Sequence, residues 1–224
     1  MARLTGEQQE WIADYERTER GMTMGRYSSD KGSFESAPLG NHLGICYRII
    51  DLGLQPASPK FPNSFAQDKI ILSFELPNEK MEDGRPFVTS IIITNFLGEK
   101  AKLRTWLVAW RGRDFTKEEL DRFDLQSILG KPCMVSIVEK DNKVIIGSIA
   151  AVPKGMSVPA LTNPQQAFWI DAWDQAVFDS LSEKVQAMIK ASAEYADRDR
   201  KSKHGDIDED LHDDAGNRDE DIPF

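Results

Sequence analysis

Two lysines and two phenylalanines are interspersed along a connection with three prolines in the first third of the chain. Aromatic rings beside cations suit a single strand of nucleic acid, because every base offers a π-face and every phosphate carries a charge. The same rings would also suit a small apolar cluster beneath their own loop, so the spacing leaves two interpretations open. The side chains are those of Lys60, Phe61, Phe65 and Lys69.

A neighbouring pair, Tyr47 and Arg48, lies inside an apolar run that predicts a strand. Successive side chains of a strand point to opposite faces, so we expect at most one of the two to line a given surface. A tyrosine in such a run is more typical of a core. The arginine needs an acceptor, and a phosphate is one candidate.

Further cations lie at the ends of predicted elements. Arg111 and Arg113 follow a predicted helix, where they would either contact phosphate or cap the helix C-terminus. Lys140 and Lys143 flank a predicted hairpin turn, where they would either line a groove or simply be solvated. We take all of them as candidate contacts to nucleic acid.

The sequence contains few residues that could form a catalytic or metal-binding site. Two of the three histidines lie in the predicted tail, which leaves little material for a catalytic triad or a zinc site. Four carboxylates near one polar turn would be magnesium ligands in a nuclease, although solvated turn acids are the simpler interpretation. We therefore expect no enzymatic activity, no metal and no cofactor. The carboxylates are those of Glu75, Glu79, Glu82 and Asp83.

The composition is that of a globular protein, with 224 residues, 40% of them hydrophobic and 29% charged. No apolar run is long enough to cross a membrane, and no secretory signal is visible at the N-terminus. Cys46 and Cys133 lie in apolar runs, so we expect two buried free thiols rather than a disulfide. These features indicate a cytoplasmic protein without membrane contacts.

The net charge of −9 is distributed unevenly. Residues 206–224 hold nine acids and one base, which gives that segment a charge of −8, and the remaining residues sum to −1. The acidity therefore belongs to the tail. The nearly neutral charge of residues 1–205 does not by itself indicate nucleic-acid binding, but it is compatible with a local basic groove.

The hydrophobic periodicity predicts three strands, then helices, then a hairpin. Leu103, Trp106, Leu107 and Trp110 form one helical stripe. Thr116 and Glu119 have the spacing of a capping box, which predicts a second short helix. The Asp141-Asn142 pair predicts a hairpin turn. The expected strands cover residues 43–53, 68–76 and 86–96 and two runs within 131–152.

This order predicts a mainly β protein with helices. Five strands with a helix between the third and the fourth is the layout of an OB-fold, a partly open barrel. An α+β sandwich with one helical layer fits the same string of elements.

We expect the chain to be organised in four parts. A helix over residues 5–20 opens the N-terminal part, and one or two amphipathic helices over residues 169–195 follow the barrel, with Ser182 as a candidate N-cap of the second. Their apolar stripe consists of Phe178, Leu181, Val185, Met188 and Ile189. This stripe should pack on the barrel or on another subunit. The parts are an N-terminal helix and loop (1–42), the barrel (43–152), a helical extension (153–196) and a disordered acidic tail (197–224).

The tail closes on DEDIPF, which resembles the C-terminal tail of bacterial and phage single-stranded DNA-binding proteins. The segments HLGICYRIIDLG, AWRGRDFTKEEL and ILGKPC look more like a phage-encoded branch of that family than like the tetrameric bacterial one. The N-terminal helix and the helical extension depart from the bacterial pattern, which leaves a homo-oligomer as an open question.

The resemblance implies a protein that coats single-stranded DNA without sequence preference in replication, recombination and repair, in the bacterial cytoplasm. It also implies a tail that recruits replication and repair proteins, with the ring and carboxylate of the last residue as anchor and the acids as a steering field. The alternative is an OB-like adaptor that binds proteins and no nucleic acid. The tail residues are Asp219, Glu220, Asp221, Ile222, Pro223 and Phe224.

Overall fold

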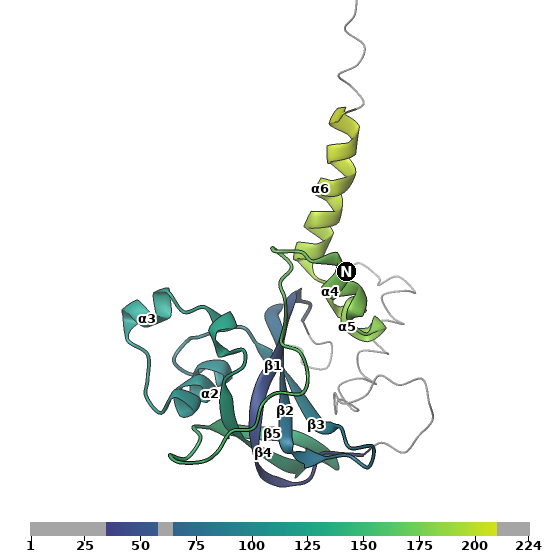
Figure 1. The fold of residues 1–224 in the computed structure, drawn as a ribbon. Helices are drawn as coiled ribbons and strands as arrows, with labels where there is room; N and C mark the ends of the chain where they lie inside the picture. The colour runs from purple at the N-terminus through teal and green to yellow at the C-terminus, as the bar shows by residue number, and fades with distance from the viewer. Residues whose placement is uncertain (1–34, 58–64, 210–224) are drawn as a thin grey trace, which may run out of the picture.

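A computed structural model of the chain describes residues 35–57 and 65–209 (Figure 1). The predicted helix at residues 5–20, the loop residues Lys60 and Phe61, and the tail motif at 219–224 lie outside this part.

The core of the fold is an antiparallel sheet with the strand order β3-β2-β1-β4-β5. All five predicted strands are confirmed, together with the β4–β5 hairpin. Asp141 and Asn142 both have positive φ at its turn, as the predicted turn requires. The strands are β1 Gly40–Gln55, β2 Gln67–Lys80, β3 Pro86–Thr94, β4 Pro132–Lys140 and β5 Lys143–Ala150.

A sixth strand, β6 (Gln166–Phe168), pairs parallel to β1 and was not predicted. Residues 40–45 of β1 pair with β4, and residues 48–50 pair with β6. The short strand therefore continues the edge of β1 where β4 leaves it. Three residues after a proline-containing linker carry too little alternation to be recognised in a sequence.

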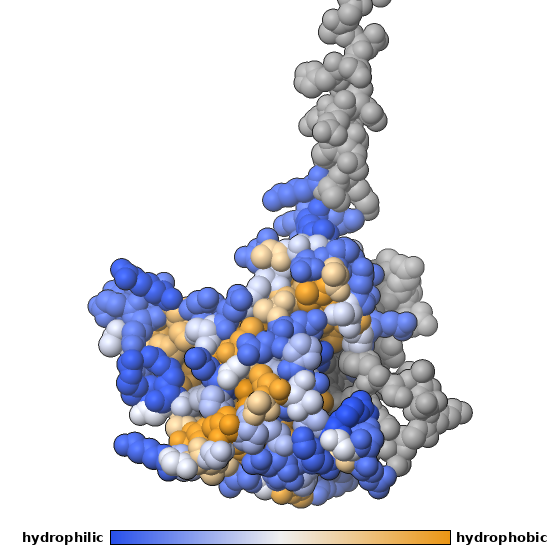
Figure 2. Space-filling model, in the orientation of Figure 1, coloured by the Kyte–Doolittle hydropathy of each residue, from blue (hydrophilic) through white to orange (hydrophobic). Residues whose placement is uncertain are grey.

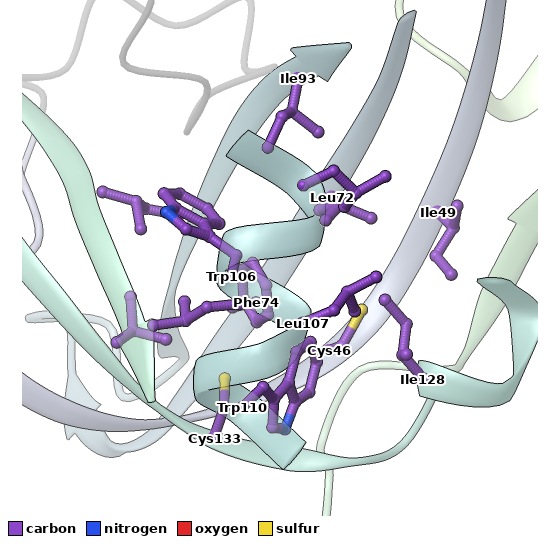
Figure 3. Packing of buried hydrophobic residues seen from close by; sticks show 14 of the residues in the cluster. Cys46, Ile49, Leu72, Phe74, Ile93, Trp106, Leu107, Trp110, Ile128 and Cys133 are labelled. Carbon is purple, nitrogen blue, oxygen red and sulfur yellow. The ribbon is translucent and has the colours of Figure 1, made fainter. Parts of the chain in front are cut away.

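Helix α2 (Lys102–Arg111) covers the inner face of the sheet and buries the predicted stripe. Figure 3 shows Trp106, Leu107 and Trp110 pointing from this helix toward Phe74. The indole Nε1 of Trp110 also donates a hydrogen bond to the Pro132 carbonyl at 2.7 Å. Alternate residues of β2 supply the opposing wall and are fully buried, as their spacing predicts: Ile70, Leu72, Phe74 and Leu76.

Two short helical segments follow α2. Helix α3 (Lys117–Asp121) begins with the predicted capping box of Thr116 and Glu119, and a 3₁₀ helix covers Leu125–Ile128. The two cysteines are free and buried, as expected. Burial raises the pKa of the Cys46 thiol to about 12, which keeps it protonated and unreactive.

The C-terminal extension packs on the outer face of the same sheet. Helix α5 (Glu183–Lys190) begins at Ser182, whose hydroxyl accepts a hydrogen bond from the Val185 amide, so the predicted N-cap is confirmed. The predicted apolar stripe of the extension is also buried, against Ile50, Leu52 and Ile71 of the sheet. Its members are Phe178, Leu181, Val185, Met188 and Ile189.

The extension differs from its prediction at both ends. Residues from Trp169 were expected to be helical, but helix α4 (Gln175–Ser180) begins only after Asp174, whose carboxylate accepts from the Val177 amide. Helix α6 (Ala193–Glu209) continues beyond Asp197, where a disordered tail was predicted. Its lysine, arginine and glutamate residues are good helix formers, and the Arg200–Asp197 ion pair links adjacent turns.

A glycine in β1 allows α6 to dock on the sheet. Gly53 has a φ of 66° at a register shift of the β1–β2 ladder. A Cβ atom there would lie 2.6 Å from Glu194 Oε2 and 2.8 Å from Ile170. The same Glu194 carboxylate accepts a hydrogen bond from the Leu54 amide at 2.9 Å. The bend at Gly53 thus joins the extension to the end of β1.

A substitution at Gly44 would test how tightly the inner core is packed. A Cβ atom at this position would lie 2.5 Å from Val135 Cγ2, on the neighbouring strand. We expect Gly44→Ala to lower the free energy of unfolding by about 1–3 kcal/mol through overpacking. The measurement is urea denaturation of Gly44→Ala, Val135→Ala and the double variant. Because the second change removes the clashing methyl group, the double variant should lose less stability than the two single losses combined, and strictly additive losses would contradict this packing.

Candidate nucleic-acid interface

Tyr47 and Arg48 lie on the same outer face of β1, contrary to the prediction that they point to opposite faces. The β1–β2 register pairs Cys46 with Phe74 and Arg48 with Ser73, so Tyr47 is an extra residue in a β-bulge. The Arg48 guanidinium carbon lies 5.5 Å from the centre of the Tyr47 ring, a cation–π contact that requires both side chains on one side. Strand alternation fails here because a bulge shifts it by one residue.

Arg48 belongs to a polar row that crosses the outer face of three strands. It pairs in register with Ser73 of β2, which pairs with Ser90 of β3, and the two serine hydroxyls are hydrogen-bonded at 2.8 Å. Arg48 is partly exposed, and its buried Nε has no acceptor among the residues that the structure describes. Tyr47 is buried instead, so Arg48 is the one of the pair that can reach a ligand.

A segment before β6, residues 161–165, crosses this outer face and is fastened by Glu75. The Glu75 side chain is fully buried. Its carboxylate accepts hydrogen bonds from the Thr162 amide at 2.9 Å, the Asn163 amide at 2.7 Å and Asn163 Nδ2 at 2.6 Å. We call residues 161–165 the strap. It covers the outer face at Glu75, next to the row that contains Arg48.

The strap and the extension shape the surface above β1. Figure 1 shows the chain after β5 passing in front of β1 on its way to α4. On this face, Figure 2 shows hydrophobic residues in a band that runs downward from the helical extension and is bordered by hydrophilic surface. The outer face of β1 is therefore largely occupied by the chain itself.

The predicted loop residues that the structure describes lie at the start of β2. Phe65 is 72% exposed, so the alternative in which it packs beneath its own loop does not hold for this ring. Lys69 is half-buried within β2 and pairs in register with Thr94 of β3. The structure thus leaves one exposed aromatic ring of this loop available for stacking.

Arg111 and Arg113 are both paired within the chain. The Glu119 carboxylate accepts hydrogen bonds from Arg111 Nη2 at 3.0 Å and from both terminal nitrogens of Arg113, at 2.9 and 2.5 Å. These arginine contacts and the Thr116 amide lower the pKa of Glu119 to about 2, with the Arg113 hydrogen bonds as the largest cause. The two arginines therefore brace the α2–α3 turn, and a phosphate would have to compete with Glu119 for them.

The hairpin lysines lie at the tip of β4 and β5, where they face each other in the ladder. Lys140 is exposed and close enough to Lys102 at the start of α2 to lower its pKa, an effect second to burial of Lys102 itself. The ammonium group of Lys102 also lies 4.6 Å from the centre of the Trp106 ring. The hairpin tip and the α2 N-terminus thus lie close together, with a lysine on each.

The carboxylates considered as metal ligands have separate partners. Glu75 holds the strap, Glu79 contacts His42 Nδ1 at 2.9 Å, and Asp83 pairs with Arg85. Within residues 35–57 and 65–209, no group of three or more His, Cys, Asp or Glu side chains is arranged to hold a metal ion.

Two features of this surface were missed by sequence reasoning. Phe96, which follows β3, is 62% exposed, and Glu75 is buried as the anchor of the strap. A weak signal for Phe96 exists, because the ring lies two residues after a strand rich in β-branched residues and two residues before a glycine. No local signal marks Glu75, since its partners are 87 and 88 residues away.

Comparison with known proteins gives no family for this chain. No protein-family model matches the sequence, and no curated protein matches it. Among the helices that the structure describes, none has the length and apolar character needed to span a bilayer.

The strap depends on one buried carboxylate. We expect Glu75→Gln to lower the free energy of unfolding by about 1–3 kcal/mol, because the amide offers one acceptor to three donors and adds an unmatched NH₂ group. Hydrogen exchange of the Thr162 and Asn163 amides should also become faster. Glu139→Gln, at an exposed position of β4, is the control. Unchanged protection of both amides in Glu75→Gln would show that Glu75 does not fasten the strap.

Proposed function

We propose that the chain is a single-stranded DNA-binding protein built on an OB-type barrel. The observation that carries this proposal is the strand order β3-β2-β1-β4-β5, with Cα atoms of β3 and β5 within 8 Å of each other. This is the neighbour order of an OB-fold barrel, whose loops bind oligonucleotides. The α2 helix between β3 and β4, with its apolar face in the core, is consistent with the same architecture.

The accessible surface supports a nucleic-acid ligand. Phe65 offers an exposed ring, Arg48 offers an incompletely bonded guanidinium, and Lys140 adds a cation at the hairpin tip. Rings and cations together bind single strands without reading the bases, because stacking and phosphate contacts are the same for every nucleotide. One fold can carry many functions, so the proposal of a nucleic-acid ligand depends on these side chains as well as on the fold.

The tail supports a second role. The motif at residues 219–224 resembles the partner-docking peptide of single-stranded DNA-binding proteins. An apolar ring with acids on its N-terminal side fits a pocket that is apolar inside and basic at its rim. In this proposal the barrel holds DNA in the cytoplasm while the tail recruits replication, recombination and repair proteins.

A titration with fluorescein-labelled oligo-dT tests the DNA-binding role. We expect anisotropy to rise at low salt, and the affinity to fall between about 50 and about 200 mM salt because counterions are released from the phosphates. A duplex of the same length is the control and should bind more weakly. No binding of oligo-dT at low salt would overturn the proposal and favour an adaptor without nucleic-acid binding.

The division of labour between barrel and tail is tested by two variants in the same titration. Removal of residues 210–224, which hold six acids and one base, should leave the oligo-dT affinity unchanged or raise it, because the acids compete with DNA for basic groups. Phe224→Ala keeps every acid and should leave the affinity unchanged while weakening capture of host replication proteins. A marked loss of oligo-dT affinity on truncation would contradict this division.

A further inference from the structure

Phe96 is an exposed aromatic ring on a fixed backbone. It follows Asn95, whose amide donates to the Asp68 carbonyl at 2.9 Å and whose Nδ2 donates to the Asp68 carboxylate at 2.9 Å. The Phe96 amide itself donates to the Thr94 carbonyl at 3.0 Å. The ring nevertheless remains 62% exposed. Exposure therefore does not arise from a loosely attached chain.

Gly98 holds the ring in place from one side. A Cβ atom at Gly98 would clash with Phe96 Cε1 and lie 2.6 Å from Cζ. The ring thus rests where the missing side chain of residue 98 would be. One side of the ring therefore lies against the Gly98 backbone, and contact on that side lowers the entropy cost of binding a ligand to the other.

Phe65 lies at the same end of the sheet. The β2–β3 ladder pairs Lys69 with Thr94, so the chain before β2 and the chain after β3 leave the ladder together. Phe65 is in the first of these segments and Phe96 in the second. They are the two strongly exposed aromatic rings in the described part of the chain.

Cations follow Phe96 closely. Lys100 and Lys102 are both exposed, and Lys102 lies near Lys140 of the hairpin. No ion pair with a carboxylate is recorded for any of these lysines within residues 35–57 and 65–209. Ammonium groups that form no ion pair among the described residues favour an anionic ligand over an apolar peptide.

We propose that Phe96, held against Gly98, is a stacking platform for a base of single-stranded DNA, with Phe65 as a second platform and Lys100, Lys102 and Lys140 as phosphate contacts. This inference rests on the proposed function. It adds Phe96, Lys100 and Lys102, which were not predicted from the sequence as DNA contacts. It also makes Gly98 a positioning residue that never touches the DNA.

The test is the binding of fluorescein-labelled oligo-dT to the full chain and to five variants. Phe96→Ala should weaken binding by roughly tenfold, the scale for losing one base–aromatic stack, and Phe96→Trp should retain it. Gly98→Ala displaces the ring without removing it and should weaken binding similarly. Phe65→Ala should weaken binding too. Met156→Ala removes an exposed apolar side chain after β5, at the opposite end of that strand from the hairpin tip, and should have no effect.

A second ligand separates stacking from charge. An oligomer of abasic sites keeps the phosphates and lacks the bases, so wild type and Phe96→Ala should bind it with equal affinity. Thermal unfolding should be unchanged in Phe96→Ala, because the ring is exposed.

Different results of the oligo-dT titration would refute the stacking platform and the DNA-binding function. If wild type binds oligo-dT and Phe96→Ala binds it equally well, the stacking platform is refuted and the function stands. If Phe96→Ala instead changes the oligomeric state with no change in affinity, the ring serves a protein contact and the inference is equally refuted. If wild type does not bind oligo-dT at low salt, both fall.

Discussion

The architecture depends on β1 being buried on both faces. Its residues alternate between the inner core, which Cys46 and Ile49 enter, and an outer core that contains Ile50 and Leu52. Each buried aliphatic side chain of this kind contributes about 1.5–3 kcal/mol, so neither face can be left in water. Helix α2 covers the inner side, and the extension with its strap covers the outer side. The C-terminal third is therefore part of the folded unit.

This constraint also decides where a ligand can bind. The extension and the strap occupy most of the outer face of β1, and Glu75 holds the strap by three hydrogen bonds. Among the residues that the structure describes, partly exposed Arg48 and the end of the sheet with its two exposed rings remain accessible. The arginines that the sequence offered as phosphate contacts, Arg111 and Arg113, are bonded to Glu119. The candidate interface is consequently smaller than the sequence suggested and lies closer to the loops.

Local features of the fold could be predicted from the sequence, and features set by distant pairing could not. The Leu103–Trp110 stripe and the Ser182 cap depend on residues within one or two helical turns, so residues close in the sequence are enough to predict them. The bulge at Tyr47 depends on which β2 residue lies opposite, and the role of Glu75 depends on a segment far along the chain. The candidate site residues followed the same division: Phe65 was proposed from its type and neighbours, whereas the contact of the Phe96 ring with Gly98 is seen only in the structure.

We propose that single-stranded DNA meets the loop end of the sheet while the extension shields the outer face of β1. Backbone amide chemical shifts, measured while oligo-dT is added to the isotopically labelled full chain, test it most directly. We expect the largest chemical-shift changes at residues 65–69, 95–102 and 140–143, and small changes over α4 and α5. Changes concentrated in α4 and α5, or no changes at saturating oligo-dT, would contradict it.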